Sequence, residues 1–193
     1  MNIVTLVPVG SIDRKHLETL AASVAPTLDA ACAISSEGLD ASVALNSLRG
    51  QYHSTELLKR LFKPAGNESW KVLGVTEADL FIPILTFVFG EAQLGPLPTA
   101  TAIVSLHRLR QEFYGLPPDA SLLTERLHKE ALHELGHTLG LRHCHDYRCV
   151  MSSSHSVEKI DLKLARFCRE CSSASPHATT PAARIGTISL NPI

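Results

Sequence analysis

The sequence predicts a mixed α/β domain with two lobes of unequal size. Residues 2–9 form an apolar run that is typical of a buried strand. Residues 71–75 and 100–106 are further apolar runs of strand length, and residues 121–139 carry the apolar stripe of a long helix. A chain of 193 residues is long enough to bury a substantial core within one domain.

The first half of the chain alternates strand and helix signals. Ser11 is expected to cap a helix that Pro26 ends, and residues 28–34 are expected to form a second strand. Another helix is expected to begin around Ser54. Its inner side is expected to carry Leu57, Leu58, Leu61 and Phe62.

Strand signals dominate the middle of the chain. Residues 79–88 are expected to form a long strand that Pro83 breaks, because proline suits an edge strand or a bulge. Residues 86–91 and 100–106 are expected to form a hairpin across the glycine- and proline-rich residues between them.

One stretch of twelve residues, HELGHTLGLRHC, concentrates histidine, glutamate and glycine. On a helix, His133 and His137 project from one face about one turn apart, near enough to share one ion. Glu134 flanks the same site, which suits a carboxylate that polarises a water molecule. His143 cannot lie on that helix face. Gly140 can end the helix in the left-handed conformation, which lets His143 return to the site.

We therefore predict a zinc ion held by His133, His137 and His143. Three histidines with one open coordination position are typical of a catalytic zinc, which lowers the pKa of bound water to about 7. The alternative is a solvated, histidine-rich helix end. Glu130 has two candidate roles, either as acceptor of the second ring N–H of His133 or as a solvated surface residue.

The segment after Gly140 is poor in apolar residues and cannot easily build its own core. Four cysteines with metal-ligand spacing suggest a second, structural zinc with a closed tetrahedral thiolate set: Cys144, Cys149, Cys168 and Cys171. The second pair is expected at the end of a helix that Ser156 caps. Two alternatives are unliganded thiols, and a site in which His145 or His155 replaces one thiolate.

With these cysteines the chain resembles the archaemetzincins, a branch of the metzincin metallopeptidases. The matching pattern is HExxHxxGxxHC, four residues, Cys, one residue, Met151, and then CxxC. The gap at residues 152–167 is one residue shorter than the family pattern. Residues 49–52, 71–91 and 105–110 also look like family sequence, so the resemblance covers residues 2–171.

The resemblance implies a metzincin-like fold. An upper lobe, residues 1–140, would hold a twisted, mostly parallel sheet with an antiparallel edge strand and two helices. A small zinc-tied lower lobe, residues 141–171, would end in a C-terminal helix. Residues 172–193 are rich in Ser, Thr, Ala and Pro and are expected to be a flexible extension.

The resemblance also implies a zinc-dependent metallopeptidase in which Glu134 activates a zinc-bound water. Its substrates would be short peptides, cleaved at the amino end, and Met151 would form the apolar floor beneath the histidines. Residues 86–91 have two interpretations, as the strand that pairs with an extended peptide or as an ordinary core hairpin. Ser153 and His155 depart from the Phe and Asn of the family and border the expected substrate pocket.

Charge and cysteine usage limit the other classes of protein. The formal net charge is −1, which argues against a nucleic-acid binder and against a polybasic membrane contact. The apolar run at the start is cut by Pro8 and has no basic segment before it, which favours a strand over a signal peptide. We expect a monomeric, cytoplasmic protein without nucleic-acid or membrane partners, whose cysteines bind metal.

Two other functions remain open. One is a zinc-stabilised interaction protein with little or no peptidase activity, suggested by the cysteine-rich lower lobe. The other is a single-strand endoribonuclease of the bacterial ribosome-maturation type, whose three histidines have the same spacing. Glu134 and the near-neutral charge disfavour the nuclease.

Overall fold

The computed structural model describes residues 2–65, 69–95, 99–175 and 177–178. Its main sheet has five strands in the order β2-β1-β5-β8-β7. The bounds are β1 Ile3–Val9, β2 Ala31–Ile34, β5 Lys71–Thr76, β7 Gly90–Ala92 and β8 Ala100–Ser105. The first four strands in that order run parallel, and β7 pairs antiparallel with β8 at the edge. The predicted fold class, a mostly parallel sheet with an antiparallel edge strand, is confirmed.

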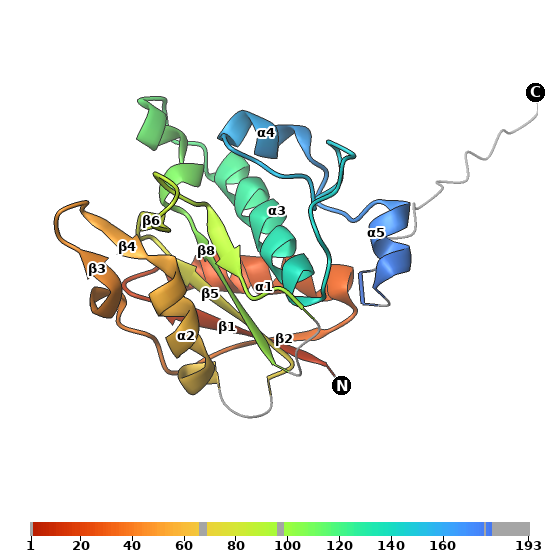
Figure 1. Ribbon diagram of the computed structural model, residues 1–193, viewed down its shortest axis with the longest axis horizontal. Helices are drawn as coiled ribbons and strands as arrows, with labels where there is room; N and C mark the ends of the chain where they lie inside the picture. The colour runs from red at the N-terminus through yellow and green to blue at the C-terminus, as the bar shows by residue number, and fades with distance from the viewer. Residues whose placement is uncertain (1, 66–68, 96–98, 176, 179–193) are drawn as a thin grey trace, which may run out of the picture.

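Helices cover both faces of this sheet (Figure 1). Helices α1 (Arg14–Leu28) and α3 (Ala120–Thr138) share one apolar core with the sheet, and α2 (Ser54–Ala65) packs on the opposite face. The two cores are separate because strand residues alternate between faces, as Leu6 and Val7 of β1 do. Within the described residues, we find no helix that is both long and apolar enough to span a membrane.

The first helix differs from its expected bounds. Asp13 caps it instead of Ser11, and the Asp13 carboxylate accepts from the Lys15 backbone N–H at 2.9 Å. Pro26 lies inside the last turn, and the helix ends where Asp29 takes a left-handed conformation with φ of 47°. The second strand therefore starts at residue 31, three residues later than expected.

A second sheet was not predicted. It contains β3 (Leu45–Asn46), β4 (Gln51–His53) and β6 (Leu80–Phe81) in that order, and β4 lies beside β6 (Figure 1). The expected long strand at residues 79–88 is wrong beyond β6, because a turn with a 3.0 Å bond from the Leu85 N–H to the Ile82 carbonyl follows it. The expected strand at 86–91 begins only at Gly90.

The chain also forms short 3₁₀ turns between the strands and helices. The 3₁₀ turns are η1 Ala41–Ala44, η2 His107–Leu109 and η3 Gln111–Tyr114. On α2, three of the four predicted inner residues are buried, but Phe62 is 47% exposed and does not belong to the core.

The cysteine-rich segment contains two short helices, where one was expected. Helix α4 (Val157–Leu162) begins after Ser156, and α5 (Arg169–Ala174) begins after Cys168. The second cysteine pair therefore lies at the start of α5 and not at the end of the helix that Ser156 precedes. Helix α5 continues past residue 171, and Ala178 is buried. The rest of the expected extension, residues 179–193, lies outside the described residues.

Candidate active site

Helix α3 carries the first two predicted zinc ligands. Its N-cap is Asp119 and not Ser121, with a 2.9 Å bond from the Leu122 backbone N–H to the Asp119 carboxylate. After the helix, Gly140 has φ of +89°, the conformation that only glycine adopts readily. The chain turns there and brings His143 back, as the sequence predicts.

The three histidine rings form one cluster. The ring centroid of His133 lies 4.7 Å from that of His137 and 5.3 Å from that of His143. The centroids of His137 and His143 are 5.0 Å apart. One nitrogen from each ring lies within 4.8 Å of the others. The Nε2 atoms of His133 and His137 are 3.2 Å apart. Two nitrogens at tetrahedral zinc distances are separated by about 3.3 Å, so the cluster fits a zinc ion.

Backbone carbonyls set the orientation of two rings. Nδ1 of His133 lies 2.8 Å from the Val150 carbonyl oxygen, and Nδ1 of His137 lies 2.8 Å from the Leu141 carbonyl oxygen. Nδ1 must donate in both bonds, which leaves each Nε2 free to bind a metal. Burial lowers the pKa of all three imidazoles, most strongly that of His133, and this favours the neutral form that ligates metal.

Glu134 lies on α3 next to the histidines and close to the edge strand. Its side chain is 5% exposed, and burial raises its pKa well above the usual value for a glutamate. The close approach of the Glu134 side chain to β7 depends on Gly90, because a Cβ at that position would lie 2.7 Å from both Cγ and Oε1 of Glu134. A side chain at position 90 would displace the carboxylate.

Glu134 and the histidines line a cleft of about 990 Å³. One wall is the segment of residues 85–92, which includes β7. Ser153 and His155, the two departures from the family pattern, also line the cleft and thus border the pocket as predicted.

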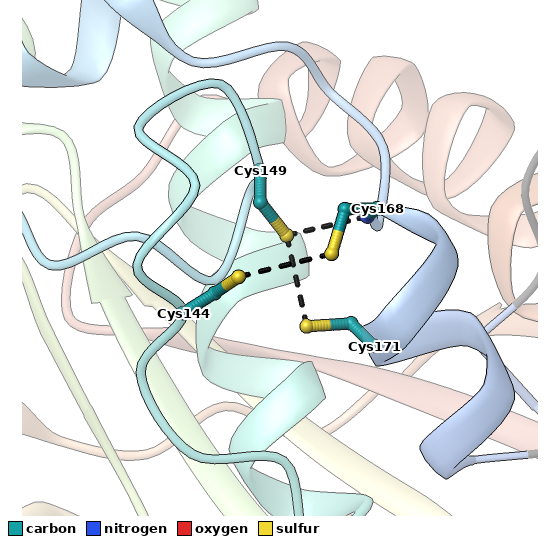
Figure 2. Close-up of side chains that lie close together, drawn as sticks. All are labelled: Cys144, Cys149, Cys168 and Cys171. Atoms are coloured by element: carbon teal, nitrogen blue, oxygen red, sulfur yellow. Dashed lines mark hydrogen bonds between the residues drawn. The ribbon is translucent and has the colours of Figure 1, made fainter.

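The four cysteines converge from two segments (Figure 2). Cys144 and Cys149 come from the loop after α3, and Cys168 and Cys171 come from the start of α5. The Sγ atoms of Cys144 and Cys168 are 3.7 Å apart, as are those of Cys149 and Cys171. Sulfurs bound tetrahedrally to one zinc lie about 3.75 Å apart, whereas a disulfide would need about 2.05 Å. The cluster therefore fits zinc.

The cysteine thiols must ionise in order to bind zinc. Burial raises the pKa of Cys149 to about 11 and also raises that of Cys171, whereas the burial of Cys168 is outweighed by hydrogen bonds from the other cysteines, which lower its pKa. Four neighbouring thiolates would repel one another without a cation, so their joint ionisation requires a bound metal. His145 and His155 do not belong to this cluster in the described residues.

Glu130 differs from both of its expected roles. It is 3% exposed, and its carboxylate accepts from Lys163 Nζ at 2.9 Å instead of bonding His133. The Lys163 side chain is fully buried, and it lies directly after α4. The sequence pattern gave no signal for this pair, because a lone lysine after a short helix is normally solvated.

Met151 lies beneath the metal helix. Its side chain is fully buried, and a Cβ added at Gly136 would lie 2.3 Å from its Sδ atom and 3.1 Å from Phe167. Gly136 thus allows close contact between α3 and the loop that carries Met151. Met151 thus packs against α3 at Gly136, next to His137, and its role as the floor beneath the histidines stays a prediction.

These features are those of a zinc-dependent hydrolase of the HExxH type, with its three predicted metal ligands in the lining of an open cleft. The sequence model of Peptidase family M54 matches residues 35–175, and the chain therefore belongs to this family of zinc metallopeptidases. The predicted resemblance to archaemetzincins is confirmed.

Similar proteins are archaemetzincins of archaea. The chain is 52% identical to that of Methanocaldococcus jannaschii over 128 residues, which cover 66% of this chain and 68% of that one. It is 36% identical to that of Thermococcus kodakarensis over 181 residues, covering 89% and 94%. The crystal structure of Archaeoglobus fulgidus archaemetzincin complexed with malonate matches with a TM-score of 0.76 and 37% identity, covering 89% and 99%.

The buried ion pair leads to a stability prediction. Replacing Lys163 with Met should lower the free energy of unfolding by about 3–5 kcal/mol, because it leaves the Glu130 carboxylate buried and unpaired. Lys163→Met combined with Glu130→Leu should recover much of this loss. The measurement is urea unfolding of zinc-loaded protein at one zinc concentration.

Lys59→Met is the matched control, since Lys59 forms an exposed pair with Glu56 on α2. Exposed pairs contribute about 0–1 kcal/mol. A loss for Lys163→Met no larger than that for Lys59→Met would contradict the structural role of the buried pair.

Proposed function

We propose that the enzyme hydrolyses peptide bonds with one catalytic zinc at His133, His137 and His143, and with Glu134 as general base. The observation that carries this proposal is the pair of free Nε2 atoms 3.2 Å apart in a cleft that also contains Glu134. Zinc at this site supplies Lewis-acid chemistry, which acidifies water and polarises the scissile carbonyl.

Glu134 is suited to move the proton during hydrolysis. It takes the proton from the attacking water and then donates it to the leaving amine. Its raised pKa makes the carboxylate a stronger base than a solvated glutamate, and the contact with Gly90 limits where its oxygens lie. The backbone bonds of His133 and His137 keep their rings turned toward the same point.

The edge strand offers a backbone surface for the substrate. The Phe89 carbonyl accepts from the Ser105 N–H at 2.8 Å, and the Gln93 N–H donates to the Thr101 carbonyl at 2.9 Å, so these groups point toward β8. Alternate residues of an antiparallel strand point the opposite way, so the backbone groups of Gly90 and Ala92 face the cleft. An extended peptide can add there as a further strand. We propose that the lobes at residues 1–140 and 141–171 enclose this peptide.

We also propose that the four cysteines hold a second, structural zinc. Because Cys144 adjoins His143, this ion would fix the loop that carries the third catalytic ligand. A closed thiolate set would contribute to folding without taking part in hydrolysis.

The metal sites predict the zinc content of variants. Purified protein should contain two equivalents of zinc per chain, and His137→Ala should contain one while remaining folded. Cys168→Ser should lose the structural equivalent, whereas Cys32→Ser is the control that keeps both because Cys32 lies in β2. Elemental analysis with circular dichroism measures this. One equivalent that survives His137→Ala but not Cys168→Ser would refute the catalytic site.

The role of Glu134 predicts a selective loss of activity. Glu134→Gln should lower kcat/KM for peptides by about 10²–10⁴-fold at unchanged zinc content, because the amide cannot accept the proton. Glu18→Gln on the exposed side of α1 is the matched control and should leave activity unchanged. Full activity of Glu134→Gln would exclude the proposed base. Absence of any peptidase activity in the parent protein would favour the interaction-protein alternative.

The family resemblance further implies cleavage of short peptides at the amino end, after neutral or basic residues. An enzyme with this specificity must recognise the N-terminal ammonium of its substrate. N-acetylation of a short substrate should then lower kcat/KM by at least about 10²-fold, because the group that binds the ammonium would be left unpaired. Matched free and acetylated peptides measure this by chromatography. Equal cleavage of both would indicate endopeptidase action instead.

A further inference from the structure

Two stretches that carry the family resemblance lie outside the zinc site, at residues 49–52 and 105–110. The structure brings them together at Asp79. Arg108 donates to both carboxylate oxygens of Asp79, at 2.7 and 2.8 Å, and Nε2 of Gln51 donates to the same carboxylate at 2.9 Å. Since Nε2 is turned toward Asp79, the amide oxygen of Gln51 points to Arg49 and accepts from its Nε at 2.9 Å.

This chain of bonds ends on the cleft wall. We call residues 85–90 the cleft rim. Nη2 of Arg49 donates to the carbonyl of Leu85 at 3.2 Å and to that of Thr86 at 3.0 Å. Gln51 Nε2 donates to the Thr86 carbonyl as well, at 3.0 Å. Two consecutive carbonyls of the rim are therefore held by side chains that come from the neighbouring sheet.

The next rim residue is held through its ring. The Arg108 guanidinium carbon lies 4.3 Å from the ring centroid of Phe87 and 4.7 Å from that of Phe113. Arg49 is itself fixed from one side, since its guanidinium carbon lies 4.1 Å from the ring centroid of Phe81. The aromatic rings therefore help to hold the guanidinium groups of Arg49 and Arg108 in place beside the cleft rim.

The rim lies between two hollows. Its front faces the zinc cleft, and a second cavity of about 690 Å³ lies behind it, lined by polar residues that include Arg49, Gln51 and Arg108. Thr86 borders both cavities. The cleft rim is therefore not supported by apolar packing at Thr86. The Thr86 carbonyl is held there by hydrogen bonds from Arg49 and Gln51, which line the rear cavity.

We propose that Arg49 and Gln51 are positioning residues for peptide binding, because they hold the cleft rim in the irregular path that leads to the free edge of Gly90. This inference rests on the proposed peptide site. Neither residue lines the zinc cleft, so neither contacts the metal site or the reacting bond. Their contribution is to the shape of the wall against which the peptide lies.

The geometry requires arginine at position 49. A guanidinium is a planar fork whose separate N–H groups reach Gln51 on one side and two carbonyls on the other. A lysine ammonium carries the same charge but has no such fork. Arg49→Lys is therefore expected to retain only part of the effect of Arg49.

The test compares two probes on zinc-loaded protein. A dipeptide hydroxamate with two apolar side chains binds both the metal and the rim, whereas acetohydroxamate reaches only the metal. Arg49→Met should weaken the dipeptide probe by about 10–100-fold and leave acetohydroxamate unchanged. Arg49→Lys should give an intermediate loss. Amide hydrogen exchange at residues 85–90 should rise in both variants.

Arg60→Met on exposed α2 is the control, since it removes the same charge and side chain without touching the rim. Unchanged dipeptide affinity in Arg49→Met, or equal weakening of both probes, would overturn the proposal. So would a parent protein that binds the dipeptide probe no better than acetohydroxamate. If the probes bind as expected but the protein cleaves no peptide, the proposed peptidase function would be wrong, and the role of Arg49 and Gln51 in peptide binding would stand.

Discussion

Buried polar groups on α3 are the constraint on which the rest of the active site depends. Glu130, His133 and Glu134 are each about 5% exposed or less. Such groups destabilise a fold unless they are paired. The partners of the first two come from beyond Gly140, as Lys163 for Glu130 and the Val150 carbonyl for His133. Pairing therefore fixes the segment after Gly140 to helix α3, in the geometry that the predicted metal ligands need.

Apolar contacts also hold that segment, because it contributes buried residues such as Val150, Ile160 and Phe167 to the core of α1, α3 and the sheet. Met151 and Phe167 reach α3 at Gly136, where the absence of a side chain allows the loop to approach closely. The cysteine cluster brings the loop after α3 next to the start of α5 (Figure 2). So short a segment cannot form a core of its own, and it is held instead by the shared core, one buried ion pair and the cysteine cluster. His143 lies between these ties, which explains how an exposed ligand keeps its place.

Sequence patterns predicted the features that depend on local chemistry. The histidine spacing, the glycine turn at Gly140 and the cysteine pairs each follow from residues within one turn or loop. The incorrect predictions concern residues whose structure depends on contacts with residues far away in the sequence. Residues 82–88 have strand-like composition, yet the carbonyls of Leu85 and Thr86 accept from the side chains of Arg49 and Gln51 instead of from a neighbouring strand. Glu130 is polar and helical, which normally indicates a surface residue, but Lys163, 33 positions later, allows it to be buried.

The carboxylates that line the two cavities differ in whether a basic side chain pairs with them. Asp79, Glu77 and Glu130 are each paired with a basic side chain, so their charges are largely compensated. Glu134 has no such partner among the described hydrogen bonds and ion pairs, and burial is the main cause of its raised pKa. The paired carboxylates therefore hold structure, whereas the unpaired Glu134 is the one that the proposed mechanism requires to exchange a proton. Asp79, which accepts from Gln51 and Arg108 behind the cleft rim, belongs to the paired group.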